Sequence, residues 1–414
     1  MSALLITNIG TLVGAHPKET LMLKGRQMQE LPTLENAWVL CEGGKISDFG
    51  KMEQIPALLP NQLTTHDAKG GYVFPSWCDS HTHIVFAASR EEEFVMKIDG
   101  KSYEEIAAAG GGILNSARKL QLASEDALYD SAAQRLSDMI RQGTGAVEIK
   151  SGYGLSTDSE LKMLRVIRRL KNDFSIPVKA SFLAAHAYPP EYKNNHEGYI
   201  RLIIEEMLPK IAEEGLADYM DTFCEQGFFS VDDTDRLLQA GAKYGLKPKI
   251  HANQLSVSGG VQIGIKHNAV SVDHLEATDE AVIESLKTSN TIATLLPSCS
   301  FYINIPFANA RGLMNANIPV AIATDYNPGS TPSGNMNLVV SLACIKLRMR
   351  PEEAINAATL NGAAAMELSK ETGSIAKGKA ANFFITRPMS SMAFLPYSFG
   401  QSQIETIILN GGIN

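Results

Sequence analysis

Cysteines and long apolar runs are scarce in this chain of 414 residues. Its five cysteines are scattered and form no CxxC pair, which excludes a disulfide scaffold and predicts reduced thiols. No apolar run approaches the roughly 20 residues that are needed to span a bilayer. The first cation is Lys18, so the start of the chain lacks the basic region of a signal peptide. We therefore expect a cytoplasmic protein without a membrane partner.

Basic clusters are also missing. The formal net charge is −8, and this acidic balance argues against a nucleic acid as the main partner. Hydrophobic residues make up 44% and charged residues 20%, which excludes a disordered or collagen-like chain. The length leaves room for one large domain and a smaller one.

Both ends of the chain are rich in β-type runs. They cover residues 4–9, 38–41 and 46–49 near the start, and residues 382–386 and 404–409 near the end. Short β segments at one end cannot build a core alone. We therefore predict that residues 1–70 and 369–414 together form one small β-sandwich domain.

The middle of the chain alternates between short β-branched runs and helical stretches. The expected strands open at Tyr72 and continue over residues 146–150, 178–185, 219–224, 249–252, 270–272, 292–296 and 320–324. The expected helices cover residues 158–171, 198–212, 231–244, 261–265, 279–286, 308–314 and 336–347. This alternation is also compatible with a doubly wound parallel sheet. The count of eight favours an α/β fold with a (β/α)₈ TIM-type barrel over residues 71–368.

Histidines and acids follow several of the expected strands, at the end of the barrel where active sites lie. His81 and His83 share one face of the first strand, because residues i and i+2 point the same way. His251, His274 and Asp325 end the fifth, sixth and eighth strands. Each feature alone is common without a metal, and a strand-end Asp is often a helix cap. Their joint occurrence predicts a site for Zn²⁺ or iron.

This pattern resembles the amidohydrolase superfamily, whose members are metal-dependent hydrolases with a barrel and a small β-sandwich. Within it the chain is similar to the imidazolonepropionase family. The motifs that carry the similarity span most of the chain: Asp79-Ser80-His81-Thr82-His83, Ser89-Arg90-Glu91, Glu148-Ile149-Lys150-Ser151-Gly152-Tyr153-Gly154-Leu155, Ala185-His186-Ala187, Asp273-His274-Leu275-Glu276, and Ala323-Thr324-Asp325 followed by Asn327-Pro328-Gly329-Ser330.

The resemblance implies a cofactor and a reaction. His81, His83, His251 and Asp325 would bind one divalent metal ion, Zn²⁺ or Fe²⁺/Fe³⁺. Water activated by this ion would hydrolyse the ring amide of 4-imidazolone-5-propanoate to N-formimidoyl-L-glutamate, a step of histidine degradation. Superfamily members with two ions use a modified lysine at the end of strand four, where this chain has Cys224 and Glu225. We therefore expect a single ion.

The resemblance also implies roles for the residues around the ion. His274 would polarise the substrate carbonyl, and Asp325 would pass a proton to the leaving nitrogen. Gln254 stands where some family members carry Glu, and since an amide moves no proton we expect it to position water or substrate. The implied substrate-binding residues are Arg90, Tyr153, His186, Gln254, Asn327, Gly329 and Ser330. The resemblance further implies a homodimer.

Several features have a second interpretation. Without the resemblance, Arg90 would be assigned to a surface ion pair with Glu91, Glu92 or Glu93, and the segment from Asn327 to Ser330 to a plain turn. The nearest alternative function is a cytosine- or guanine-type deaminase of the same superfamily. Such an enzyme relies on the Glu that Gln254 replaces, and it needs no Arg90 for a propionate. Cys299 has no base beside it in the sequence, so we interpret it as a packing residue.

Overall fold

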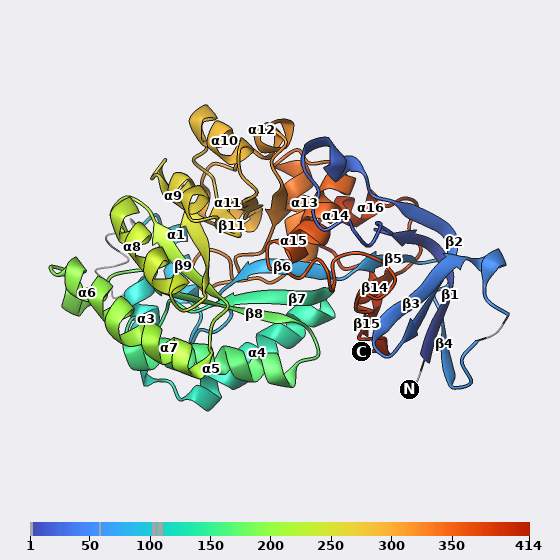
Figure 1. Ribbon diagram of the computed structural model, residues 1–414, viewed down its shortest axis with the longest axis horizontal. Coiled ribbons are helices and arrows are strands. Elements are labelled where there is room, and N and C mark those ends of the chain that lie inside the picture. The colour runs from blue at the N-terminus through green and yellow to red at the C-terminus, as the bar shows by residue number, and fades with distance from the viewer. Residues whose placement is uncertain (1–2, 58, 102–104, 106–110) are drawn as a thin grey trace.

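The computed structural model describes residues 3–57, 59–101, 105 and 111–414. Its strands form two separate sheets of eight strands each. One sheet curves into a barrel with helices around it, and the other lies beside the barrel and contains both ends of the chain (Figure 1).

The barrel is built in chain order from parallel strands. They are β6 (Trp77–Thr82), β7 (Thr144–Lys150), β8 (Val178–Ala185), β9 (Tyr219–Cys224), β10 (Lys247–Ala252), β11 (Ser271–His274), β12 (Ile292–Leu295) and β13 (Val320–Ile322). The segment after β13 returns to β6, where the Asp325 amide donates to the His81 carbonyl over 3.0 Å and the His83 amide donates to the Tyr326 carbonyl over 2.9 Å. The predicted TIM-type barrel is confirmed.

Helices connect the strands and cover the outside of the barrel (Figure 1). They are α1 (Glu91–Ile98), α3 (Ile113–Leu122), α4 (Glu125–Arg141), α5 (Thr157–Asp173), α6 (His196–Leu202), α7 (Leu208–Glu214), α8 (Val231–Ala242), α9 (Gly260–Lys266), α10 (Glu280–Lys287), α11 (Pro297–Ile303), α12 (Ala310–Asn315), α13 (Met336–Ile345), α14 (Pro351–Ala358), α15 (Leu360–Ala364) and α16 (Phe394–Tyr397). Among the described residues, no helix combines the length and the apolar character that crossing a membrane requires.

Helix α8 shows how the sequence sets these elements. The Ser230 hydroxyl accepts from the Asp233 amide over 3.1 Å, and the Asp233 carboxylate accepts from the Ser230 amide over 3.2 Å. This capping box satisfies two amides that have no partner inside the helix. Gly245 follows the helix with φ of 77°, a left-handed conformation that costs glycine little.

The second sheet joins the two ends of the chain. Its strands are β1 (Ala3–Val13), β2 (Thr33–Glu42), β3 (Lys45–Lys51), β4 (Leu63–Asp67), β5 (Tyr72–Pro75), β14 (Phe383–Thr386), β15 (Ile404–Leu409) and β16 (Gly412–Ile413). The sheet is mixed, since β1 pairs antiparallel with β2 but parallel with β4 and β5. Strand β5 pairs with β14, so residues that lie far apart in the sequence share one core, as the β-type runs at both ends predict.

One expected strand is divided between the two sheets. The sequence predicts a single barrel strand that opens at Tyr72, but β5 pairs with β1 and β14 in the second sheet. Pro75 ends β5, and a proline cannot donate to a strand ladder. The barrel strand begins two residues later, where the Trp77 amide donates to the Gly143 carbonyl over 2.9 Å. The domain limits at residues 70/71 and 368/369 stay a prediction.

Candidate active site

The polar residues singled out from the sequence lie at the carboxyl end of the barrel strands. His81 is on β6, His251 on β10 and His274 at the end of β11, while His83 directly follows β6 and Asp325 lies three residues after the end of β13. All five are at least nine-tenths buried. Because the strands are parallel and belong to one barrel, four separate parts of the sequence present side chains to one space.

Four of these residues form a compact cluster of possible metal donors. The His83 Nε2 lies 3.3 Å from the His81 Nε2 and 3.4 Å from the His251 Nε2. The Asp325 Oδ1 lies 3.5 Å from the His81 Nε2 and 3.7 Å from the His83 Nε2. Four ligands placed about 2.0–2.1 Å from a tetrahedral ion lie about 3.3–3.4 Å apart. His81, His83 and Asp325 are thus close enough to share an ion, and His251 adjoins them through His83, so the full ligand set stays a prediction.

Two carboxylates orient the histidines of this cluster. The His81 Nδ1 lies 2.6 Å from the Asp273 Oδ2, and the His251 Nδ1 lies 3.1 Å from the Asp221 Oδ1. Each ring then donates from Nδ1 and keeps a lone pair on Nε2, which is the arrangement that a metal-binding histidine needs. Among the described residues the His83 Nδ1 has no hydrogen-bond partner.

The electrostatics favour neutral rings at the cluster. Burial holds the pKa of His81 well below its usual value, and Lys150 and the neighbouring histidines act in the same direction. Burial and the nearby His186 and His251 do the same for the pKa of His83. A neutral imidazole is the form that binds metal, so this cluster is suited to a cation.

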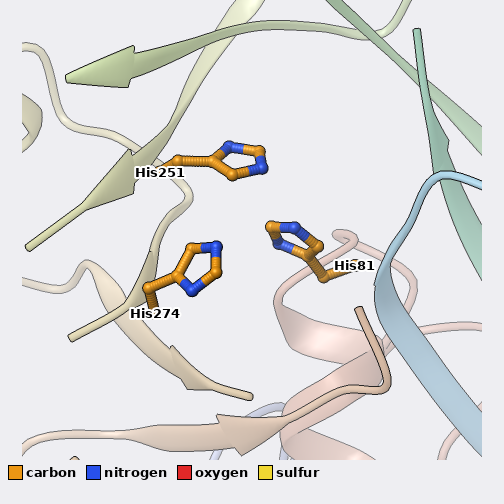
Figure 2. Close-up of side chains that lie close together, drawn as sticks. All are labelled: His81, His251 and His274. Carbon is orange, nitrogen blue, oxygen red and sulfur yellow. The ribbon is translucent and has the colours of Figure 1, made fainter. Parts of the chain in front are cut away.

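His274 lies beside the cluster in a different environment. Figure 2 shows its ring turned toward the same space as those of His81 and His251, and these three rings are also close enough to share an ion. Burial opposes a charge on His274, but the Glu276 carboxylate, 3.4 Å from its Nδ1, acts with the charges of Asp325 and Asp273 to outweigh burial and raise the pKa. His274 is therefore better suited to donate a proton or hydrogen bond than to bind metal. Its φ of 86° is a strained conformation that is typical of functional sites.

A cavity of about 760 Å³ opens over the cluster. The residues from the predicted site that line it are His83, Arg90, Tyr153, His186, His251, Gln254, His274, Asp325, Asn327, Gly329 and Ser330. The structure thus brings every predicted site residue to one cavity except His81, which is fully buried beneath it. Their individual roles stay predictions.

Arg90 is held at this cavity by polar contacts. Its Nε donates to the Ser116 hydroxyl over 2.8 Å, and its Nη1 lies 3.9 Å from the Glu93 carboxylate. The Glu93 carboxylate also accepts from the Gly112 amide over 2.9 Å. The ion pair with Glu93 is therefore long, and Ser116 and Glu93 are the side-chain contacts of the guanidinium among the described residues. The pair that the second interpretation expected is present, but it lies largely buried at the cavity, and the binding role of Arg90 stays a prediction.

The segment from Asn327 to Ser330 connects Arg90 to the cluster. The Asn327 side chain accepts from the amides of Gly329 and Ser330 over 2.7 and 2.8 Å, which closes a tight turn. The Ser330 hydroxyl donates to the Asp325 Oδ2 over 3.1 Å. The turn thereby holds the carboxylate of Asp325 and also borders the cavity.

Tyr153 and His186 form another wall of the cavity. The His186 Nδ1 donates to the Gly152 carbonyl over 3.1 Å, and its ring stacks on His83 with centroids 5.3 Å apart. Burial lowers the pKa of His186 to about 3, so its ring is neutral and its Nε2 is an acceptor. Burial raises the pKa of Tyr153, which keeps its hydroxyl protonated.

Sequence reasoning missed Glu160, which holds the loop that carries Tyr153. This fully buried carboxylate accepts from the amides of Gly152, Gly154 and Leu155 over 3.1, 2.7 and 2.9 Å. In the sequence Glu160 is one acid in the first turn of an amphipathic helix, where acids are common. Only its position on the buried face of α5 distinguishes it.

Gln254 and Cys299 face each other at the cavity. The Gln254 Nε2 lies 3.7 Å from the Cys299 Sγ. Burial raises the pKa of Cys299 well above its usual value, so its thiol stays protonated. This agrees with a packing role rather than a nucleophile.

Comparison with known proteins identifies the family. The amidohydrolase family pattern matches residues 72–413. The chain is 56% identical over 408 residues to the imidazolonepropionase of Christiangramia forsetii, covering 99% of each protein. It is 43% identical over 393 residues to the imidazolonepropionase of Clostridium tetani, covering 94% of this chain and 93% of the relative.

Solved structures share the fold at much lower identity. Guanine deaminase of E. coli superposes with a TM-score of 0.74 at 15% identity, covering 100% of this chain and 99% of that one. Guanine deaminase of C. acetobutylicum superposes with a TM-score of 0.72 at 15% identity, covering 100% of both chains. These two likenesses concern the fold alone, whereas the long matches at high identity concern the whole sequence. The chain belongs to the amidohydrolase family, and its relatives at high identity within that family are imidazolonepropionases.

Proposed function

We propose that this chain hydrolyses 4-imidazolone-5-propanoate to N-formimidoyl-L-glutamate, as its relatives' name implies. The observation that carries the proposal is that the Arg90 guanidinium and the cluster of metal donors line the same cavity. Such a cavity offers an anion-binding group and an electrophilic centre to one small molecule. The 56% identity to an imidazolonepropionase over nearly the whole chain supports the same substrate.

The cluster of His81, His83, His251 and Asp325 would hold one divalent ion. A set of three imidazole nitrogens and one carboxylate oxygen suits Zn²⁺ or iron in the Fe²⁺/Fe³⁺ states. The ion, when bound, lowers the pKa of water from 15.7 to about 7 and so supplies the nucleophile. Elemental analysis of the protein purified without added metal would tell the two metals apart.

The residues around the cavity bind and orient the substrate. The planar guanidinium of Arg90 pairs with the propionate carboxylate, and the turn from Asn327 to Ser330 packs beside it. Tyr153 donates a hydrogen bond to the imidazolone ring, and the His186 Nε2 accepts one from it. A donor and an acceptor at different places in the wall thus fix the orientation of the ring. The Gln254 amide holds the attacking water or the ring by hydrogen bonds.

His274 and Asp325 move protons during the reaction. His274, whose pKa Glu276 helps to raise, donates to the carbonyl oxygen as negative charge develops there. Asp325 accepts a proton from the attacking water and passes it to the ring nitrogen as the carbon–nitrogen bond breaks. Burial raises the pKa of Asp325, which favours this temporary protonation.

The test is turnover of the purified protein with 4-imidazolone-5-propanoate, measured as loss of the ultraviolet absorbance of the ring. We expect turnover that a chelator abolishes and added metal restores. No turnover by the metal-replete protein would overturn the proposal. Release of ammonia from guanine or cytosine instead would favour the deaminase alternative.

The family resemblance also predicts a homodimer, and the scattered cysteines and the lack of long apolar runs predict a cytoplasmic location. The five cysteines are free in the structure, as expected in a reducing compartment. The mass in solution and the location of a tagged chain in its host would test these two expectations.

A further inference from the structure

Five charged side chains lie beneath the candidate metal cluster, and only two of them, Asp221 and Asp273, have been given a part in the site so far. All five have 0% exposure, and they come from strands β7, β9, β10 and β11: Glu148, Lys150, Asp221, Lys249 and Asp273. Charged groups are rarely buried unless they are paired, because their removal from water is costly. A group of five charges therefore calls for an explanation in terms of its contacts.

Lys150 is the centre of these contacts. Its Nζ lies 2.5 Å from the Glu148 Oε1, 2.8 Å from the Asp221 Oδ2 and 3.6 Å from the Asp273 Oδ2. Asp221 and Asp273 are the two carboxylates that accept from the Nδ1 atoms of His251 and His81. One ammonium thus contacts both carboxylates that orient the ring nitrogens toward the cluster.

The shared ammonium also keeps two buried anions near each other. Coulomb repulsion between two carboxylates is strong away from water, and a cation between them offsets it. Without Lys150, the remaining side-chain partners of Asp273 among the described residues are His81 and the Ser271 hydroxyl, which donates over 2.5 Å. Both carboxylates would then lose their contact with a cation, and the rings that they hold would lose a fixed orientation.

We infer that Lys150 is a positioning residue for the metal site: its single ammonium holds Asp221 and Asp273 where each carboxylate directs one histidine, His251 or His81, toward the ion. This inference rests on the proposed function, since it requires that the cluster binds a metal. It extends the site by a lysine that touches neither ion nor substrate.

Lys249 provides a matched control. It is equally buried and it also pairs with Glu148, on the opposite carboxylate oxygen. Its other hydrogen bonds go to the carbonyl oxygens of Ser80 and Ala365 over 3.1 and 3.3 Å. Loss of Lys249 therefore removes a buried cation from the same group without freeing Asp221 or Asp273.

The experiment compares metal binding by the wild type, Lys150→Met and Lys249→Met. Each full-length protein is loaded with Zn²⁺, and its affinity is measured by competition with a chromogenic chelator. Removal of groups that orient metal ligands typically weakens binding about 10–100-fold. We expect this loss for Lys150→Met and wild-type affinity for Lys249→Met. The visible spectrum of the Co²⁺-loaded proteins should change in Lys150→Met alone.

The outcomes separate this inference from the proposed function. Wild-type Zn²⁺ affinity in Lys150→Met, or equal losses in both lysine variants, overturns the inference and leaves the proposed function standing. A wild type that binds no divalent ion overturns the proposed function itself. If Lys150→Met does not fold, the variant Lys150→Met/Glu148→Gln removes one charge of each sign and is expected to show the same loss of affinity.

Discussion

Arg90 and Gly329 approach each other so closely that the glycine has no room for a side chain. A Cβ placed on Gly329 would lie 2.6 Å from the Arg90 Nη1. The backbone of Gly329 is held from the other side, since its amide donates to the Asn327 side chain over 2.7 Å. The turn after Asp325 therefore packs against the guanidinium and limits where it can lie.

Gly329→Ala should displace the guanidinium rather than unfold the chain, because Arg90 is flexible and the turn is not. Charge-assisted hydrogen bonds contribute about 1.5–3 kcal/mol, so we expect KM for 4-imidazolone-5-propanoate to rise about 10–100-fold. The melting temperature should stay near that of the wild type. Gly412→Ala is the control, because its Cβ would meet only the Leu409 carbonyl at 3.5 Å. An unchanged KM in Gly329→Ala would contradict the proposed place of Arg90.

Arg90→Ala tests the anion-binding role directly. Loss of a bidentate partner for a carboxylate should raise KM by at least about 10-fold, with a smaller effect on kcat. Arg118→Ala removes an arginine that donates to the Asn115 side chain on the same helix, and it should leave both constants unchanged. Lys97 also lines the cavity. If Lys97→Gln raised KM and Arg90→Ala did not, the propionate would be held by the lysine instead.

The barrel can be predicted from the sequence because each of its strands is recognisable within a short stretch of residues. Residues 178–185 form a strand with the expected limits. A run of apolar and β-branched residues can be recognised as a strand without knowing which strand it pairs with. The histidines are equally visible, because alternation puts His81 and His83 on one face. The division of the chain at Ser76 between two sheets is not visible, because it depends on pairing with β14, about 310 residues away along the chain.

The groups that support the site are invisible for the same reason. Lys150 has one partner nearby in the sequence, Glu148, but nothing near Lys150 or Asp221 in the sequence indicates that these two residues contact each other. Their supporting role in the site depends on contacts between β7, β9 and β11, which form only in the folded chain. Helix α11 was not expected, because its start coincides with the end of the β12 run and its Pro297 reads as a break. It begins at this proline, since the first helical position needs no amide donor.

Removal of the metal should lower the stability of the folded chain. The His83 Nε2 lies 3.3 Å from the His81 Nε2 and 3.4 Å from the His251 Nε2 at the proposed metal site, and this arrangement exists only in the folded state. A ligand present at 100 times its Kd stabilises the folded state by about 2.7 kcal/mol. We expect a chelator to lower the melting temperature and Zn²⁺ to restore it. His81→Ala should lose this response, whereas His267→Ala, whose ring pairs with Asp235 in α8, should keep it. A melting temperature that does not respond to the chelator would contradict the metal site.

Lys379 predicts how stability depends on alkaline pH. Burial lowers the pKa of Lys379 from 10.5 to about 8 in the folded chain, while its Nζ donates to the Ser374 hydroxyl over 2.7 Å. Between these two pH values the unfolded chain binds a proton that the folded chain lacks, so a rise in pH favours the folded state. We expect the free energy of unfolding of the wild type to rise relative to Lys379→Met from pH 8 to 10.5. A constant difference across this window would show that Lys379 has its ordinary pKa.

Glu160→Gln tests whether the loop of Tyr153 is held by a carboxylate. Both oxygens of Glu160 accept from backbone amides, whereas the nitrogen of a glutamine side chain accepts from none. At least one buried amide then loses its partner, at a cost of about 1–3 kcal/mol. We expect a lower free energy of unfolding and, because Tyr153 and His186 line the cavity proposed to bind substrate, a KM raised about 10-fold. Asp158→Asn changes an exposed acid in the first turn of the same helix and should alter neither quantity. A loss of stability in Glu160→Gln with an unchanged KM would mean that Glu160 supports the fold but does not position Tyr153.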